Sequence, residues 1–173
     1  LGFATPGGME AVQLEEIQAR SIRDRSAIHV ATNLFCAVLV LAISFSSAPI
    51  WAITSWVGAL VAYNVIWYTT LRNKDISAGR RATRRDFLEM GRNAGISGVI
   101  WGSALPFLGS YGAMPQWLGI WSVSLAMMVY ASMVIPSLPI AATAFIAIAT
   151  LGGFFGWALH GEYYLALANA ALG

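Results

Sequence analysis

Apolar residues form long runs along this chain, and short polar or proline-containing breaks separate them. A run of about 20 apolar residues is long enough to cross the hydrocarbon core of a bilayer as an α-helix. Most breaks are short, so successive helices are predicted to pair as antiparallel hairpins. The predicted spans cover about residues 27–45, 50–71, 93–108, 117–135 and 140–159, followed by an incomplete run at 163–173. The pattern therefore predicts an all-α fold, a polytopic membrane helix bundle of about six transmembrane helices in three antiparallel hairpins, the sixth truncated.

Polar residues gather in two segments, the first of which is the amino terminus. Residues 1–25 are predicted to form a tail and an amphipathic cytoplasmic helix that starts at Met9. Leu14, Ile17 and Ile22 give this helix a narrow apolar stripe, and charged residues occupy its other faces. The remaining residues, 26–173, are expected to be the transmembrane module. A helix that ended in mid-bilayer would leave carbonyl groups without partners in hydrocarbon, so we expect the natural chain to continue.

Residues 72–92 form the second polar segment, a basic loop between the second and third predicted spans. It holds seven of the ten Lys and Arg residues, while residues 26–71 carry no charge and residues 93–173 carry only Glu162. Basic residues close to the ends of spans stay on the cytoplasmic side of a membrane. This rule predicts a multi-pass protein of the bacterial inner membrane, with the amino terminus and the basic loop in the cytoplasm. Four arginines are predicted to contact lipid headgroups and fix this topology: Arg80, Arg81, Arg84 and Arg85.

The composition supports the membrane class and narrows the partners. Hydrophobic residues make up 58% of the chain and charged residues 10%, against about 25% charged residues in an average soluble domain. The net charge of +2 is small and its basic residues lie in two patches, which favours contact with anionic headgroups over nucleic acid. The predicted partner is therefore the lipid bilayer, and no nucleic acid is expected.

Four glycines in and just before the third predicted span fall on one helical face: Gly91, Gly95, Gly98 and Gly102. Glycine lets another helix approach closely, which is how helices associate in lipid. Two interpretations remain open. The glycine face packs against another helix of the same chain, with Gly152, Gly153 and Gly156 as the expected counterpart, or it forms the seam of a homodimer or of a complex with another membrane protein.

The external side of the predicted topology carries one polar cluster, His160, Glu162 and Tyr163, which is a candidate for sensing a proton, a metal or a small ligand. An ordinary polar turn at the membrane interface is the alternative. His29 is expected on the opposite side of the membrane, so the two histidines do not form a haem or metal pair. No metal site and no cofactor are predicted.

Catalytic and transport chemistry find little support in the sequence. No nucleophile, metal-ligand or phosphate-binding motif is present, and no Asp, Glu, Lys or Arg falls in the middle of a predicted span. Ion-coupled transporters usually carry such residues at mid-bilayer, so a small transporter is the less favoured reading. Asn33 and Asn64 do lie inside spans and are expected to make hydrogen bonds between helices. No catalytic residue is predicted, and whether a longer parent protein is an enzyme stays open.

The order of these segments resembles a family of bacterial signalling proteins. An amphipathic pre-helix, a hairpin, an arginine-rich loop and the segment GISGVIWGSALPFL from Gly95 to Leu108 follow one another, and the likeness covers roughly residues 10–173. This layout is similar to the N-terminal multi-span sensor region of GGDEF/EAL (cyclic-di-GMP) signalling proteins or related sensor histidine kinases. The resemblance implies a sensory and anchoring module for a cytoplasmic diguanylate cyclase, phosphodiesterase or kinase domain that this chain lacks. The alternative is an accessory or structural subunit of a larger membrane complex.

Overall fold

The protein is built from helices. The computed structural model describes residues 9–73, 84–134 and 139–172. Within these ranges it contains six α-helices, one short 3-10 turn and no strand, which confirms the predicted all-α class. The elements in chain order are α1 (Met9–Ser44), α2 (Ile50–Asn73), α3 (Arg84–Leu108), η1 (Gly109–Tyr111), α4 (Met114–Val134), α5 (Pro139–Leu159) and α6 (Tyr163–Leu172).

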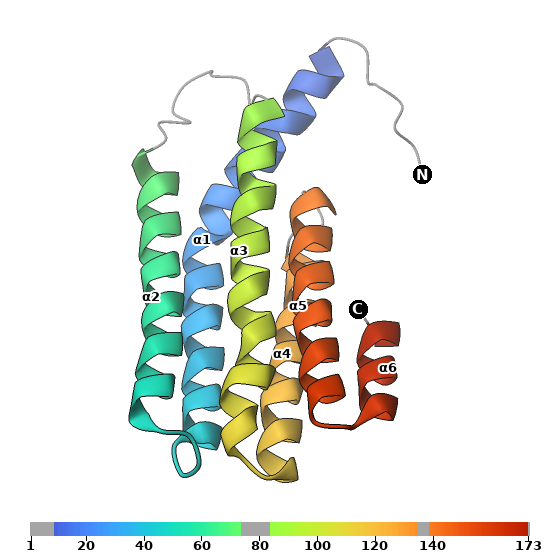
Figure 1. Ribbon diagram of the computed structural model, residues 1–173. Helices are drawn as coiled ribbons and strands as arrows, with labels where there is room; N and C mark the ends of the chain where they lie inside the picture. The colour runs from blue at the N-terminus through green and yellow to red at the C-terminus, as the bar shows by residue number, and fades with distance from the viewer. Residues whose placement is uncertain (1–8, 74–83, 135–138, 173) are drawn as a thin grey trace.

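The first helix is longer than a membrane span. It runs without interruption from Met9 to Ser44, because no glycine or proline, the two residues that weaken a helix most, occurs between these positions. The amphipathic segment and the first apolar run, which the sequence divides near residue 25, are therefore parts of one helix. In Figure 1 its first turns extend beyond the rest of the bundle.

Three helices, not six, are long and apolar enough to cross a membrane within the described part of the chain. They contain the segments Ala27–Ser44, Ile50–Thr70 and Ala141–Leu159. The expectation of about six spans is therefore too high. Helix α3 begins in the charged segment, α4 has Pro115 and Gln116 in its first turn, and α6 has only ten residues. A polytopic helical bundle remains, with three helices that qualify by length and composition.

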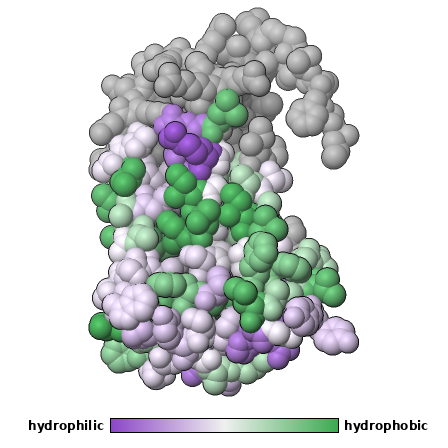
Figure 2. All heavy atoms as spheres, viewed as in Figure 1, coloured by the Kyte–Doolittle hydropathy of each residue, from purple (hydrophilic) through white to green (hydrophobic). Residues whose placement is uncertain are grey.

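The helices lie side by side in one bundle (Figure 1). In this view α1 and α2 lie on one side of α3, and α5 and α6 on the other. The end of α2 and the start of α3 are at one end of the bundle, and the turn between α5 and α6 is at the opposite end. Figure 2 shows hydrophilic residues gathered over the start of α3, with a band of apolar side chains next to them.

Helices α3 and α5 approach each other at the level of the backbone. A Cβ atom added to Gly98 would lie 2.8 Å from the carbonyl oxygen of Phe145, and one added to Gly152 would overlap the backbone of Gly102. A Cβ at Gly156 would lie 3.1 Å from a methyl carbon of Leu105. Such close approach is the usual role of small residues between membrane helices. Gly95, Gly98 and Gly102 of α3 are thus covered by α5 of the same chain. Of the three expected counterparts, Gly152 and Gly156 face α3, whereas Gly153 faces Asn169 of α6.

Candidate functional site

The polar cluster expected on the external side lies in the turn between α5 and α6. Gly161 has φ +84°, and its N–H donates to the carbonyl of Ala158 (3.1 Å) while the N–H of Glu162 donates to that of Trp157 (3.0 Å). These two bonds form a Schellman motif, which ends α5 and turns the chain into α6. The geometry of the turn therefore explains the glycine at position 161.

The side chains of this cluster do not converge on a ligand position. The His160 ring stacks on Trp117, with ring centroids 4.3 Å apart and planes inclined by 22°. Tyr163 is 67% exposed and points away from the core. Among the described residues no group of three His, Cys, Asp or Glu side chains could hold a metal ion. His160 is best described as an aromatic packing partner at this end of the bundle.

The four arginines predicted to fix the topology are at the opposite end. Arg80 and Arg81 lie outside the described residues, and for Arg84 and Arg85 the structure describes only the helical backbone of the first turn of α3. Two turns further, Arg92 is described and exposed, and Gly91 beside it is buried. Arg92, the first arginine of α3 whose side chain the structure describes, therefore lies on the surface of the bundle.

A buried amide joins α1 to α3. Asn33 is fully buried, and its Oδ1 accepts a hydrogen bond of 2.8 Å from the indole N–H of Trp101. Its Nδ2 donates to the carbonyl of His29 (3.1 Å) and lies 3.0 Å from the ring Nε2 of the same residue. The His29 ring in turn packs against Trp67 and Tyr130, with centroid distances of 4.9 Å and 6.0 Å. The predicted role of Asn33 in interhelical hydrogen bonding is confirmed by this contact.

A second buried amide has the same chemistry and was missed by sequence reasoning. Asn169 on α6 accepts a hydrogen bond of 2.9 Å from the indole N–H of Trp121 on α4, and its Nδ2 donates to the carbonyl of Thr150 on α5 at 2.7 Å. The signal in the sequence is a lone asparagine in an apolar run, as at Asn33. Asn64 gives the same signal, but within the described residues it bonds the carbonyl of Leu60 in its own helix, so the expected interhelical bond is not found there.

Helix α2 is fixed to α3 near its amino-terminal half. The indole N–H of Trp56 donates to the carbonyl of Ile100 at 2.9 Å, and the Trp56 ring meets Trp101 edge to face at 5.5 Å. Trp56 and Trp101 are both almost completely buried. We call this contact the Trp56 anchor. Beyond it, toward the end of α2, the two helices are separated by a groove.

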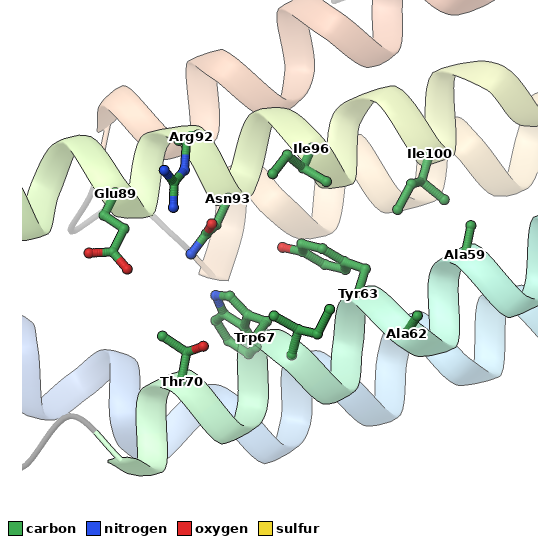
Figure 3. A pocket seen from close by; sticks show the side chains of 11 residues that line it. Ala59, Ala62, Tyr63, Trp67, Thr70, Glu89, Arg92, Asn93, Ile96 and Ile100 are labelled. Atoms are coloured by element: carbon green, nitrogen blue, oxygen red, sulfur yellow. The ribbon is translucent and has the colours of Figure 1, made fainter.

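The groove between α2 and α3 has a volume of about 320 Å³, which is near the lower limit of small-molecule sites. Figure 3 shows that its polar groups gather at one end, where Glu89, Arg92 and Asn93 of α3 face Trp67 and Thr70 of α2. Its other end is apolar and reaches the level of the Trp56 anchor. The residues lining it are Ala59, Ala62, Tyr63, Ile66, Trp67, Thr70, Glu89, Arg92, Asn93, Ile96 and Ile100.

The sequence held a partial signal for the groove. Its α2 lining recurs at intervals of three and four residues from Ala59 to Thr70, and its α3 lining does so from Glu89 to Ile100. Each set therefore lies on one helical face. Nothing in the sequence says that these two faces oppose each other. Comparison with protein-family models, with curated proteins and with solved structures finds no match to this chain.

Proposed function

We propose that this chain is a membrane sensory and anchoring module of a bacterial signalling protein, and that the groove between α2 and α3 is its input site. The observation that carries the proposal is an asymmetry in how α2 is held. The Trp56 anchor and, two turns further along α2, a side-chain hydrogen bond between Tyr63 and Ser97 join it to α3, whereas the groove separates the two helices beside these contacts and toward the end of α2. A molecule or side chain that fills the groove would therefore push the end of α2 away from α3, while the Trp56 anchor keeps the two helices together.

The rest of the bundle provides the fixed frame for such a movement. Helix α3 is held to α1 by Asn33 and Trp101, and to α5 by the glycine contacts. The last turn of α2, beyond the hydrogen bond between Tyr63 and Ser97 and the contact of Trp67 with His29, is the part that can tilt away from this frame. Its last residues lead directly into segment 74–83, which connects back to α3. In this proposal, filling the groove changes the distance between the end of α2 and the start of α3, which the basic loop connects.

The wedge is tested by spin-label distances in phospholipid nanodiscs. The single cysteine, Cys36, is replaced by alanine, and labels are placed on Thr69 and Leu88, which are exposed on α2 and α3 at the polar end. Ala62→Trp fills the groove with a permanent side chain. We expect the distance between these labels to lengthen by a few ångström in the filled variant.

A second label pair provides the control for this experiment. Ser55 and Val99 are exposed on the same two helices close to the Trp56 anchor, and their separation should stay constant. Unchanged distances at both pairs would show that the groove is static and would contradict a sensory role. Ala62→Phe serves as a smaller filling if the tryptophan variant proves unstable.

In the proposed orientation, the basic loop and the amino terminus lie on the cytoplasmic side of a bacterial inner membrane. The GGDEF/EAL or kinase domain implied by the resemblance would lie on the same side. Replacing all four arginines (Arg80, Arg81, Arg84 and Arg85) by glutamate should invert or scramble this topology. The reason is that the positive charges that keep the loop on the cytoplasmic side would be removed. The measurement is a pair of reporter fusions, one in segment 74–83 and one at Ser110. If both reporters keep their original activity, the arginines do not set the orientation.

The second candidate, an accessory subunit of a larger membrane complex, is favoured by one feature of α2. Gly58, Ala59 and Ala62 are exposed, and a Cβ at Gly58 would meet nothing within 4 Å. Exposed small residues three and four positions apart accept a helix from another protein or from a second copy. Stoichiometric co-purification of a partner that is lost in Gly58→Leu would support this function over the sensory one.

A further inference from the structure

We infer that His29 is a proton-binding site, and that binding of a proton to its Nε2 atom releases the end of α2 from α1. The ring lies where three helices meet, since it packs against Trp67 of α2 and Tyr130 of α4 with centroid distances of 4.9 Å and 6.0 Å. The inference goes beyond the proposed function, because it requires nothing to fill the groove. It stands on three observations: a chain of hydrogen bonds with fixed donors, the position of His29 at the end of its apolar segment, and the role of Trp67 in holding α2.

The hydrogen-bond chain determines where the proton of the neutral ring is. An indole N–H can only donate, so Trp101 fixes Oδ1 of Asn33 as the atom that accepts its bond of 2.8 Å. The Nδ2 group of Asn33 must then face His29, where it donates to the backbone carbonyl at 3.1 Å and lies 3.0 Å from Nε2. An amide NH₂ group donates and does not accept, so Nε2 is the acceptor and carries no proton. The neutral ring therefore has its proton on Nδ1.

A second proton cannot be added to the ring without breaking this chain. A protonated histidine donates at both ring nitrogens, so the N–H at Nε2 would point at the NH₂ group of Asn33. Turning the amide around does not help, because its nitrogen would then face the indole N–H of Trp101 and its oxygen would face the carbonyl of His29. Asn33 and Trp101 are almost completely buried, whereas His29 is only partly buried. Protonation is therefore expected to expel the His29 ring and to leave the bond between Asn33 and Trp101 intact.

The position of His29 gives protons access to the ring. It is the third residue of the apolar segment Ala27–Ser44, which places it about 3 Å from the start of that segment along the helix axis. It lies near the polar end of the groove, because Trp67 both contacts the His29 ring and lines the groove. An expelled imidazolium would therefore reach water at this end of the bundle by a change of side-chain rotamer.

The side chains packed against the ring from other helices are aromatic and carry no acid. Tyr130 is the titratable group among them, and α4 contains no Asp, Glu, Lys or Arg. The charged residues of α3 at this end whose side chains are described are Glu89 and Arg92, which line the groove together with Trp67. The faces of aromatic rings attract cations, so Trp67 and Tyr130 oppose the release. A ring that stays in place when it is protonated would show that this attraction prevails and would overturn the inference.

Loss of the contact between Trp67 and His29 enlarges the part of α2 that can move. The contacts described above that hold α2 are the Trp56 anchor, the hydrogen bond between Tyr63 and Ser97, and the packing of Trp67 against His29. Of these, the contact of Trp67 is nearest the end of the helix. Without it the last of them is the one at Tyr63, and the helix beyond Tyr63 gains freedom to tilt away from α1.

The first test determines the tautomer of His29. Nitrogen NMR of the full chain with isotope-labelled histidine in phospholipid nanodiscs distinguishes the two ring nitrogens, and His160→Gln removes the signal of the other histidine. We expect a proton on Nδ1 alone at about pH 8 and on both nitrogens at about pH 4, a range that spans the ordinary titration of imidazole. A proton on Nε2 at the higher pH would overturn the inference.

The second test measures the release of α2 by spin-label distances in the same nanodiscs. Cys36 is replaced by alanine, and labels are placed on Phe35 and Thr69, which are exposed on α1 and α2. We expect the distance between these labels to lengthen by a few ångström as the pH falls from about 8 to about 4. A constant distance over this range would contradict the release.

A second label pair provides the control for this measurement. Phe35 and Val99 report the distance from α1 to α3 and are both exposed. Because the bond between Asn33 and Trp101 is retained, their separation should not change with pH. A parallel lengthening of this distance would overturn the inference, since it would mean that the bundle opens as a whole.

Three variants assign the response to the His29 ring. His29→Gln cannot be protonated, so its distance should stay short at both pH values, and His29→Lys carries a permanent charge, so its distance should be long already at the higher pH. His160→Gln removes the other histidine and should keep the full response. A response that persists in His29→Gln or disappears in His160→Gln would overturn the assignment.

Trp101→Phe tests the hydrogen-bond chain itself. It removes the donor that fixes the Asn33 amide, so the amide oxygen can turn toward a protonated His29 ring and hold it in place. The change of distance with pH should therefore shrink, and an unchanged response would show that the chain is not its cause. Failure here is distinct from failure of the proposed function, because the Ala62→Trp experiment fills the groove at constant pH.

Discussion

Gly152→Val is expected to prevent α3 and α5 from packing and to lower the free energy of unfolding by about 3 kcal/mol or more, the upper end of overpacking costs. The Cβ of the new residue would occupy the position of the Gly102 backbone. A side chain could change its rotamer to avoid this overlap, but the backbone of a helix cannot move independently. The Gly102 carbonyl also lacks its usual helical donor, because residue 106, four positions on, is a proline without an N–H. The hydrogen of Gly152 that points to this oxygen is a weak C–H donor, and valine would replace it.

The control is a series of glycines with graded surroundings. Gly58→Val changes the same residue type in a helix but meets nothing within 4 Å, so it should cost only a small fraction of that amount. Gly95→Ala places a Cβ 3.2 Å from the terminal methyl of Ile148, a flexible side chain, and should be intermediate. Unfolding in mixed micelles, followed by tryptophan fluorescence, measures all three. Equal loss of stability at Gly58 and Gly152 would show that the α3–α5 contact does not set the effect.

Asn33→Leu is expected to destabilise the bundle by about 1–2 kcal/mol, whereas Asn64→Leu is expected to be neutral or stabilising. Both asparagines are buried in apolar runs. Asn33 accepts the only hydrogen bond that the buried Trp101 indole makes in the described residues, so its loss leaves that N–H without a partner. Asn64 bonds within its own helix, and its Oδ1 has no hydrogen-bond partner among the described residues. Replacing it therefore removes an unsatisfied atom.

A double-mutant cycle isolates the interhelical bond. Trp101→Phe removes the donor, Asn33→Leu removes the acceptor, and the pair together should cost about 1 kcal/mol less than the sum of the two single changes. Unfolding in mixed micelles again provides the free energies. A coupling energy of zero, or equal costs for the two leucine variants, would mean that the bond does not hold α1 to α3.

The two indole–amide pairs divide the bundle into a fixed part and an adjustable part. Asn33 with Trp101 ties α1 to α3, and Asn169 with Trp121 ties α6 to α4 and, through the Thr150 carbonyl, to α5. Helix α2 takes part in neither pair. It is held by the Trp56 anchor, by the hydrogen bond between Tyr63 and Ser97, and by the packing of Trp67 against His29. This distribution of contacts is the basis on which we propose movement of α2.

Local features of this protein follow directly from its sequence. The uninterrupted apolar runs determine the helices, and the absence of glycine and proline from residues 9–44 determines the length of α1. Gly161 determines the turn after α5, since it adopts a φ of +84° that other residues avoid. The spacing of Gly95, Gly98 and Gly102 places them on one face of α3, and α5 was the expected neighbour. The predicted number of spans was too high because the helix that contains residues 93–108 begins in the charged segment and α6 has only ten residues.

Only the tertiary structure decided which faces meet. In a soluble bundle the buried face of a helix is the apolar one. Here Ile53 is buried and Ile66 is exposed, although both belong to the apolar run of α2. Lipid and protein interior are equally apolar, so hydropathy does not tell one face of α2 from another. The opposition of Trp67 to Asn93, the pairing of Asn169 with Trp121 and the stacking of His160 on Trp117 all depend on that choice of faces. The sequence determined the helices, and packing between them determined the groove.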